Sequence, residues 1–170
     1  KFERKFSKYQ SRNEAILFNS GGSANLAMIQ ALKNLGLVKD HDKIGFSALT
    51  WSTNVMPILQ MGNIPVPIDC EINTLNVSSN KLLKALEDFD IRVLFLTNVL
   101  GFVDDIEKIR DICNDKNIIL LEDNCESLGT VTKGGERTGN FGLASSFSFF
   151  VAHHMSTIEG GMVCTDNEEF

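Results

Sequence analysis

Short apolar runs alternate with helix-like segments along almost the whole chain, and this alternation restricts the fold more than any other feature of the sequence. The runs are continuously apolar rather than half polar, which indicates strands covered on both faces. Strands of this kind that are joined by helices form mostly parallel sheets. We therefore expect a single α/β domain over residues 1–170, with a mainly parallel sheet between two helical layers in a three-layer αβα arrangement.

Glycines, capping residues and changes in periodicity set the expected element boundaries. Ser78 or Ser79 could cap one helix, and Gly36 ends another. The sequence predicts strands at residues 15–20, 44–49, 64–68, 92–97 and 117–123, two more on either side of residues 153–160, and helices at residues 2–10, 21–36, 52–61, 80–89 and 104–114.

The composition limits the partners that the chain can have. It is 43% hydrophobic and 22% charged, with a formal net charge of −6, and an acidic surface disfavours nucleic acids and anionic membranes. No apolar run reaches the roughly 20 residues that span a bilayer. The four cysteines form no C-x-x-C pair, which is typical of reduced cytosolic thiols. We therefore expect a cytoplasmic protein without nucleic-acid or membrane partners.

Two of the three histidines, His153 and His154, are adjacent and lie between an apolar strand and a Glu-Gly-Gly turn that opens another strand. On an extended segment their side chains point to opposite faces, so at most one of them faces a given pocket. A histidine there could transfer protons near neutral pH. The alternative is a pair of hydrogen-bonded loop histidines without a catalytic role.

Three further features fall at the ends of predicted strands, where parallel sheets collect ligands. The turn around Gly22 and Ser23 leads from a strand into a helix and could bind a phosphate through backbone N–H groups, or be a flexible turn only. Asp123 could bind a metal ion, a ribose hydroxyl or a protonated ring nitrogen, or cap a helix. Trp51, the only tryptophan, could stack on a planar cofactor or lie in the core. Together these groups are what a pyridoxal-type cofactor requires.

Six segments, taken together, resemble a known family, and they run from Phe2 almost to the end of the chain. They are FERKF, NSGGSANL, TWSTNVMPILQMGNIPVPID, LLEDNCESLGT, GNFGLASSFSF and HHMSTIEGGM. In this order and spacing they resemble the vitamin-B6-dependent aminotransferases and dehydratases that act on nucleotide-linked 4-keto sugars. The resemblance implies the large domain of the type I aminotransferase fold, the cofactor pyridoxal 5'-phosphate, and a homodimer with its active sites between two subunits.

One position departs from the aminotransferases of that family. They carry a lysine, which binds the cofactor covalently, where this chain has His153, and no lysine follows Lys133. An imidazole cannot form that link but can still take up a proton. The chain therefore resembles the 3-dehydratase branch, in which the cofactor is bound noncovalently and cycles through pyridoxamine 5'-phosphate.

The resemblance implies a reaction and its partners. A 3-dehydratase removes the hydroxyl group at carbon 3 of a nucleotide-linked 4-keto-6-deoxyhexose. This step belongs to deoxysugar and surface-polysaccharide (O-antigen) biosynthesis. An amino acid such as glutamate would supply the amine. His153 would be the catalytic base, and His154 would be structural.

The resemblance also implies the residues that bind the cofactor. Asp123 would pair with the protonated ring nitrogen, Trp51 would stack on the ring, and Glu126 would lie near the ring hydroxyl. The phosphate would be held by the backbone of Gly22 and Ser23 and by the Ser148 hydroxyl. Cys125 is expected to be an inert small residue; the alternative is that it binds an iron-sulfur cluster. No other metal ligand is expected.

Other interpretations stay open. An aminotransferase would need the lysine that the chain lacks. A third interpretation is a noncatalytic binding module derived from the family. A fourth is a plain Rossmann-type nucleotide binder, although the chain lacks the dinucleotide fingerprint. The chain begins at Lys1 and stops at Phe170 within an apparent helix start, so we expect a fragment that lacks the true amino terminus and a small carboxyl-terminal domain and that is inactive alone.

Overall fold

The computed structural model describes every residue from Lys1 to Phe170. Its helices and strands agree in number and order with those predicted, and their ends differ by a few residues. In chain order they are α1 (Phe2–Gln10), β1 (Glu14–Phe18), α2 (Gly21–Asn34), β2 (Lys43–Ser47), α3 (Ser52–Gln60), β3 (Ile64–Ile68), α4 (Ser79–Asp88), β4 (Ile91–Thr97), the 3-10 turn η1 (Val99–Gly101), α5 (Ile106–Asp115), β5 (Ile119–Asp123), β6 (Ala144–Ser148) and β7 (Gly161–Thr165).

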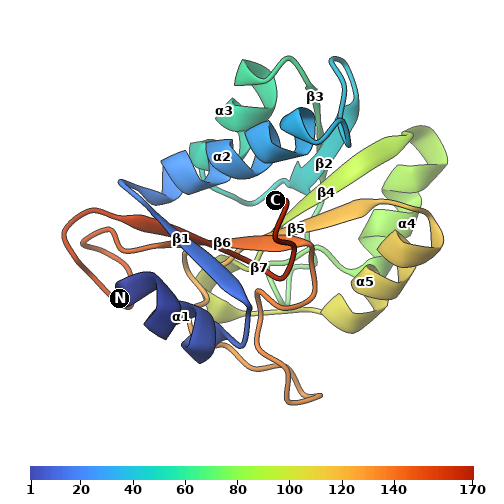
Figure 1. Cartoon of the computed structure of the whole chain (residues 1–170). Coiled ribbons are helices and arrows are strands. Elements are labelled where there is room, and N and C mark those ends of the chain that lie inside the picture. The colour runs from blue at the N-terminus through green and yellow to red at the C-terminus, as the bar shows by residue number, and fades with distance from the viewer.

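The seven strands form one sheet in the order β1-β7-β6-β5-β4-β2-β3. The five strands β6, β5, β4, β2 and β3 are parallel to one another. β7 is antiparallel to both β6 and β1, so the first and last strands of the chain lie side by side (Figure 1). The prediction of a mainly parallel sheet is confirmed.

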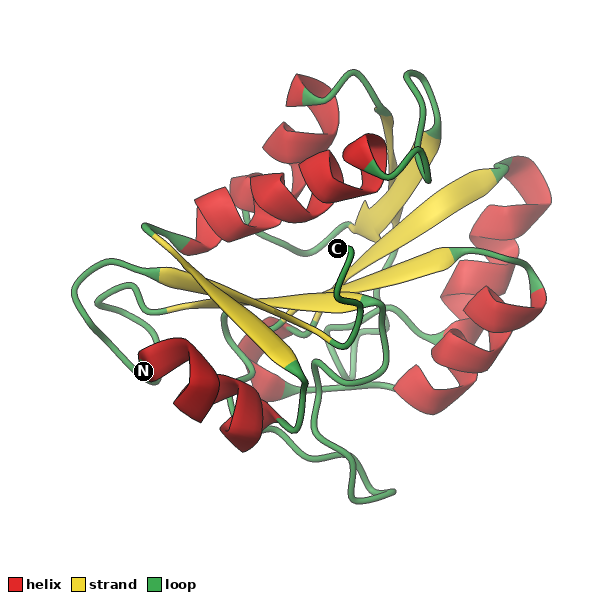
Figure 2. Ribbon diagram, in the orientation of Figure 1, coloured by secondary structure: helices red, strands yellow, loops and turns green.

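Helices cover both faces of the sheet, which confirms the three-layer arrangement (Figures 1 and 2). α2 and α3 pack on one face, and α1, α4 and α5 pack on the other. Neighbouring residues of a strand serve opposite layers: Val93 and Leu121 belong to the core under α2 and α3, whereas Leu94 and Leu120 belong to the core under α4 and α5. Because successive strand side chains alternate between faces, continuous apolar runs supply both cores.

The predicted helix ends have identifiable causes. Ser78 caps α4, because its hydroxyl accepts the N–H of Lys81 at 3.2 Å, which settles the choice between Ser78 and Ser79. Gly36 follows α2 with a φ of +69°, a left-handed conformation that suits glycine after a helix.

One local expectation is wrong. The two histidines do not lie on an extended segment, because β6 ends at Ser148 and a loop of turns follows. Beyond Phe149, whose N–H still donates to Gly160 O at 2.9 Å, the loop bonds to itself. The N–H of Thr157 donates to Phe149 O and the N–H of His153 donates to Phe150 O, both at 2.9 Å. These bonds replace the ladder that an extended strand would continue.

Glu122 is a fully buried carboxylate that organises the connection from β5 to β6. It accepts the backbone N–H groups of Gly139, Phe141 and Gly142 at 2.6, 2.8 and 2.9 Å. Burial raises the pKa of Glu122, and these three donors oppose the rise. The connection contains no helix, so this side chain replaces the hydrogen bonds that a helix would have supplied to the backbone.

We predict that Glu122→Gln destabilises the fold. Glutamine has one acceptor oxygen, and its amide group would face a backbone N–H, so at least one buried donor would lose its partner. The expected loss in the free energy of unfolding is about 1–3 kcal/mol, measured by urea denaturation of the purified protein. The exposed Glu87 on α4 offers the control: Glu87→Gln should change stability by less than about 0.5 kcal/mol. Equal stability of the two variants would contradict the anchoring role.

Candidate active site

Four neighbouring strands of the sheet end in polar residues. β2, β4, β5 and β6 are parallel, and their last residues are Ser47, Thr97, Asp123 and Ser148. All four are buried, although apolar residues fill most other strand positions. Buried polar groups are costly unless they are hydrogen-bonded. Their concentration at the carboxyl edge of the sheet, where α/β proteins bind ligands, marks this edge as the candidate site.

Asp123 is the charged residue in this row, and it is only 3% exposed. Its Oδ2 accepts the side-chain amides of Asn25 at 2.9 Å and Asn54 at 2.8 Å, and its Oδ1 accepts the N–H of Cys125 at 2.9 Å. No helix begins after β5, so Asp123 does not cap one, and that alternative is wrong. The carboxylate is instead fixed at the strand end by three donors from three segments.

The sequence analysis did not single out Asn25 and Asn54. Both amides are almost fully buried and lie near the starts of α2 and α3. The signal available in the sequence was their position, because each follows a strand end by a few residues inside a segment that resembles the family. Their partner could not be deduced from spacing, since Asp123 is 98 residues from Asn25 and 69 residues from Asn54.

The glycine turn before α2 lies beside Ser148. A Cβ atom placed on Gly21 would come within 2.7 Å of Ser148 Cβ and 3.2 Å of Cys125 Sγ, so only glycine fits there. Ser20 caps α2 by accepting the N–H of Ser23 at 3.1 Å. The N–H groups of Gly21 and Gly22 have no acceptor within the chain. The structure thus places the predicted Gly22, Ser23 and Ser148 around one helix start with free backbone donors.

Trp51 and Glu126 have different surroundings. Trp51 precedes α3 and is 75% exposed, so the alternative that it is a core residue is wrong. Glu126 Oε2 accepts the N–H of Leu100 at 3.0 Å, where the backbone of Leu100 has a φ of +53°. Glu126 therefore holds the turn after β4, whatever else it contacts.

His153 lies in the loop between β6 and β7. It is partly buried, and its Nδ1 atom is buried without a hydrogen-bond partner. Its ring contacts the Phe150 ring edge to face, with centroids 5.9 Å apart. His154 is exposed. The alternative was a pair of hydrogen-bonded loop histidines. The structure disagrees with it at His153, because Nδ1 of that residue has no hydrogen-bond partner.

Cys125 lies against the carboxylate of Asp123. Burial raises the pKa of its thiol well above the ordinary value, and the negative charge of Asp123 raises it further. The thiol is therefore protonated at neutral pH. No group of three or more His, Cys, Asp or Glu side chains in the chain is arranged to hold a metal ion.

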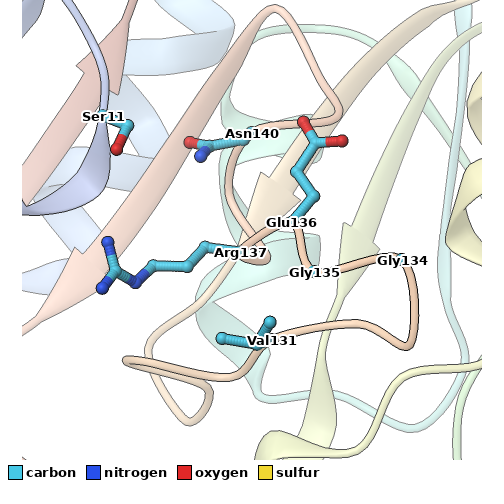
Figure 3. Close-up of a pocket in the computed structure, with 7 residues that line it drawn as sticks. All are labelled: Ser11, Val131, Gly134, Gly135, Glu136, Arg137 and Asn140. Carbon is cyan, nitrogen blue, oxygen red and sulfur yellow. The ribbon is translucent and has the colours of Figure 1, made fainter.

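A hollow of about 500 Å³ lies away from these residues (Figure 3). It is lined mainly by the loop from Val131 to Asn140, with Ser11 from the end of α1. Ser11 and Asn140 shortly precede β1 and β6, so the hollow lies at the opposite edge of the sheet from Asp123. It contains none of the predicted site residues. None of the helices has both the length and the apolar character needed to cross a bilayer.

Comparison with known proteins gives consistent matches over the whole chain. A family model described as the DegT/DnrJ/EryC1/StrS aminotransferase family matches residues 1–170. The chain is 39% identical to GDP-4-keto-6-deoxy-D-mannose 3-dehydratase of Escherichia coli O55:H7 and 36% identical to that of Yersinia pseudotuberculosis. In both cases the match covers 99% of this chain and 43% of the relative.

A solved structure gives the same result. The E. coli GDP-4-keto-6-deoxy-D-mannose-3-dehydratase with bound hydrated PLP superposes with a TM-score of 0.91 at 38% identity, covering 98% of this chain and 43% of that one. The predicted fold, the large domain of the type I aminotransferases, is confirmed by this match. The chain spans less than half of the length of these relatives. From the family model and these likenesses we conclude that the chain belongs to the DegT/DnrJ/EryC1/StrS aminotransferase family.

Proposed function

We propose that the protein containing this chain is a vitamin-B6-dependent 3-dehydratase of a nucleotide-linked 4-keto-6-deoxy sugar. The observation that carries the proposal is His153, an imidazole with a buried, unpartnered Nδ1 in the loop that leaves β6. No lysine follows Lys133 in the chain, so no amine of this segment is present to bind a cofactor covalently. The 39% identical E. coli relative bears the name of such a dehydratase.

The residues at the carboxyl edge of the sheet fit a pyridoxal-type cofactor. The free N–H groups of Gly21 and Gly22 at the start of α2 suit a phosphate. The buried carboxylate of Asp123 suits a protonated ring nitrogen, and the largely exposed indole of Trp51 suits the face of a ring. When bound, pyridoxamine 5'-phosphate supplies an amine that condenses with a ketone and a ring that withdraws electrons.

Each side chain then has a defined task. Asp123 holds the ring nitrogen protonated and so maintains the electron-withdrawing character of the ring. The hydroxyl of Ser148 accepts the N–H of Phe150 at 3.3 Å and keeps its own hydrogen for a phosphate oxygen. Ser23 adds a hydroxyl at the same helix start. Glu126 remains a candidate partner for the ring hydroxyl through the carboxylate oxygen that Leu100 does not use. His153 accepts and returns a proton during the reaction.

Several properties of the whole protein belong to the same proposal. The chain would be the cofactor-binding large domain of a longer protein, because it spans 43% of the relatives. The protein would act in the cytoplasm as a homodimer, with glutamate or another amino acid as amine donor. Its product would enter deoxysugar and O-antigen biosynthesis. The acidic net charge of −6 disfavours nucleic acids and anionic membranes as partners.

The test uses the full-length protein with pyridoxal 5'-phosphate, glutamate and a panel of nucleotide-linked 4-keto-6-deoxy sugars. Mass spectrometry of the sugar product should show the loss of one oxygen atom. Gain of an amino group in place of the ketone would identify an aminotransferase and overturn the proposal. Cofactor binding without any change in the sugar would indicate a noncatalytic binding module of the family and would also overturn the proposal.

We predict that His153→Asn abolishes most turnover and leaves cofactor binding intact. Asparagine can occupy the space but cannot accept a proton, and the loss of a general base lowers rates about 10²- to 10⁴-fold. Product formation is followed by mass spectrometry, and bound cofactor by absorption after gel filtration. The neighbouring exposed His154 is the matched control: His154→Asn should retain the parent rate within about twofold. Equal rates of the two variants would exclude His153 as the base.

We also predict that Trp51→Ala weakens cofactor binding without destabilising the fold. The indole is 75% exposed, so its removal should change the free energy of unfolding by less than about 0.5 kcal/mol. Loss of a stacking contact should raise the Kd for pyridoxamine 5'-phosphate roughly 2- to 10-fold, measured by isothermal titration calorimetry. Ile72, which is 84% exposed, provides the control, since Ile72→Ala should affect neither quantity. An unchanged Kd in Trp51→Ala would show that the cofactor ring does not stack on Trp51.

A further inference from the structure

The two oxygens of the Asp123 carboxylate differ in their remaining capacity for hydrogen bonds. Oδ2 accepts two N–H groups, from Asn25 and Asn54, whereas Oδ1 accepts one, from Cys125. Each carboxylate oxygen offers two lone pairs. Oδ2 is therefore saturated by the two amides, whereas Oδ1 keeps one acceptor site that no N–H group of the chain uses. The Cys125 thiol also bonds this carboxylate, but a thiol is a weak donor that a ligand N–H can replace.

The charge of Asp123 is stabilised by neutral groups alone. None of the ion pairs in the chain involves Asp123, and its three donors are two side-chain amides and one backbone N–H. A Lys or Arg partner would have cancelled the negative charge. Amide donors stabilise a buried carboxylate and leave its net charge available, so the site is prepared for a cation.

Asn54 is the last member of a chain of oriented hydrogen bonds. A carboxylate has no hydrogen to donate, so the Nδ2 group of Asn54 must face Asp123 and its Oδ1 must face Thr50, which donates to it at 2.9 Å. The hydrogen of the Thr50 hydroxyl is thereby used, so Thr97 is the donor in the 2.7 Å contact between the two hydroxyls. Each hydrogen bond in this series, from Thr97 to Thr50 to Asn54, points toward Asp123, and aligned hydrogen bonds strengthen one another.

Asn25 is oriented by a second acceptor. Its Nδ2 group donates to Asp123 at 2.9 Å and to the backbone carbonyl of Thr53 at 3.1 Å. The reverse orientation of the amide would place an oxygen against two other oxygens, so this one is fixed. The side chain is fully buried and comes from α2, whereas Asn54 comes from α3. Two helices thus each contribute one rigid donor to the same carboxylate oxygen.

We propose that Asn25 and Asn54 are positioning residues that hold the carboxylate of Asp123 turned so that Oδ1 faces the protonated ring nitrogen of the cofactor. The proposal rests on the proposed function for the identity of that cation. Without the two amides, Asp123 would keep only the N–H group and the weakly donating thiol of Cys125. A buried carboxylate that has lost these two donors can rotate, and rotation removes the partner of the ring nitrogen.

The test compares two variants of the full-length protein with a matched control. Asn54→Ala removes one donor directly. Thr50→Val keeps the shape of the side chain and removes the hydroxyl that orients Asn54, without touching Asp123. The control is Asn63→Ala, because Asn63 is also a buried asparagine that bonds backbone carbonyls, but its partners are Lys39 and Asp42.

The first measurement is the ¹⁵N chemical shift of bound pyridoxamine 5'-phosphate labelled at its ring nitrogen, together with its Kd. In Asn54→Ala we expect the resonance to move toward that of the unprotonated ring and the Kd to rise roughly tenfold or more. Thr50→Val should shift the ¹⁵N resonance and the Kd in the same directions, but by smaller amounts. Asn63→Ala should lose stability and move neither. The proposal would be overturned if Asn54→Ala and Thr50→Val both kept the ¹⁵N chemical shift and the Kd of the parent protein.

The second measurement needs no cofactor, which separates this proposal from the proposed function. Crystal structures of the cofactor-free parent, Asn54→Ala and Asn63→Ala give the orientation of the Asp123 carboxylate. If the parent does not bind pyridoxamine 5'-phosphate, the proposed function fails. A carboxylate rotated in Asn54→Ala alone would still support the positioning role, and an unchanged carboxylate would overturn it.

Discussion

A buried negative charge at the end of β5 sets conditions that several other segments must meet. Asp123 is 3% exposed and has no cationic partner in the chain, so its charge depends on hydrogen bonds. These bonds come from residues near the starts of α2 and α3 and from the turn after β5. Burial of an isolated carboxylate is too costly for a domain of ordinary stability. The starts of these two helices are therefore tied to the strand end by this single group, and the edge of the sheet becomes a rigid site.

The neighbouring residue, Glu122, shows how one strand separates structure from function. Successive side chains of β5 point to opposite faces, so two adjacent carboxylates reach different environments. Glu122 accepts three backbone N–H groups of one loop and, on Oε2, also the side-chain amide of Asn98 at 3.4 Å, so both of its oxygens are saturated and it fixes the path of that loop. Asp123 is bonded mainly by side chains and keeps one acceptor site on Oδ1. The unequal saturation of the two buried acids, rather than their burial, is the reason that we propose a ligand-binding role for Asp123 and a structural role for Glu122.

The sequence predicted the architecture well, because the fold depends on local periodicity. Apolar runs gave each strand, and Ser78 and Gly36 mark helix ends through local hydrogen bonds and a left-handed backbone. The site was predictable only in part. Asp123 could be placed at a strand end, but Asn25 and Asn54 could not be assigned to it, because that contact spans many residues of chain and depends on how two helices pack. The loop form of the His153 segment also escaped prediction, since its hydrogen bonds close within residues that resemble a strand.

The antiparallel part of the sheet explains how His153 reaches the same edge as Asp123. In the parallel part each helical connection carries the chain back to the opposite edge before the next strand begins. β6 and β7 are antiparallel, so the loop between them reverses at the carboxyl edge and stays there. The start of β7 is pressed against the glycine turn, because a Cβ on Gly161 would come within 2.2 Å of the backbone oxygen of Ser20. The loop that carries His153 is thus fastened at one end to the turn that presents the free N–H groups. The proposed base on this loop and the proposed phosphate site at the start of α2 therefore both depend on this contact between Gly161 and Ser20.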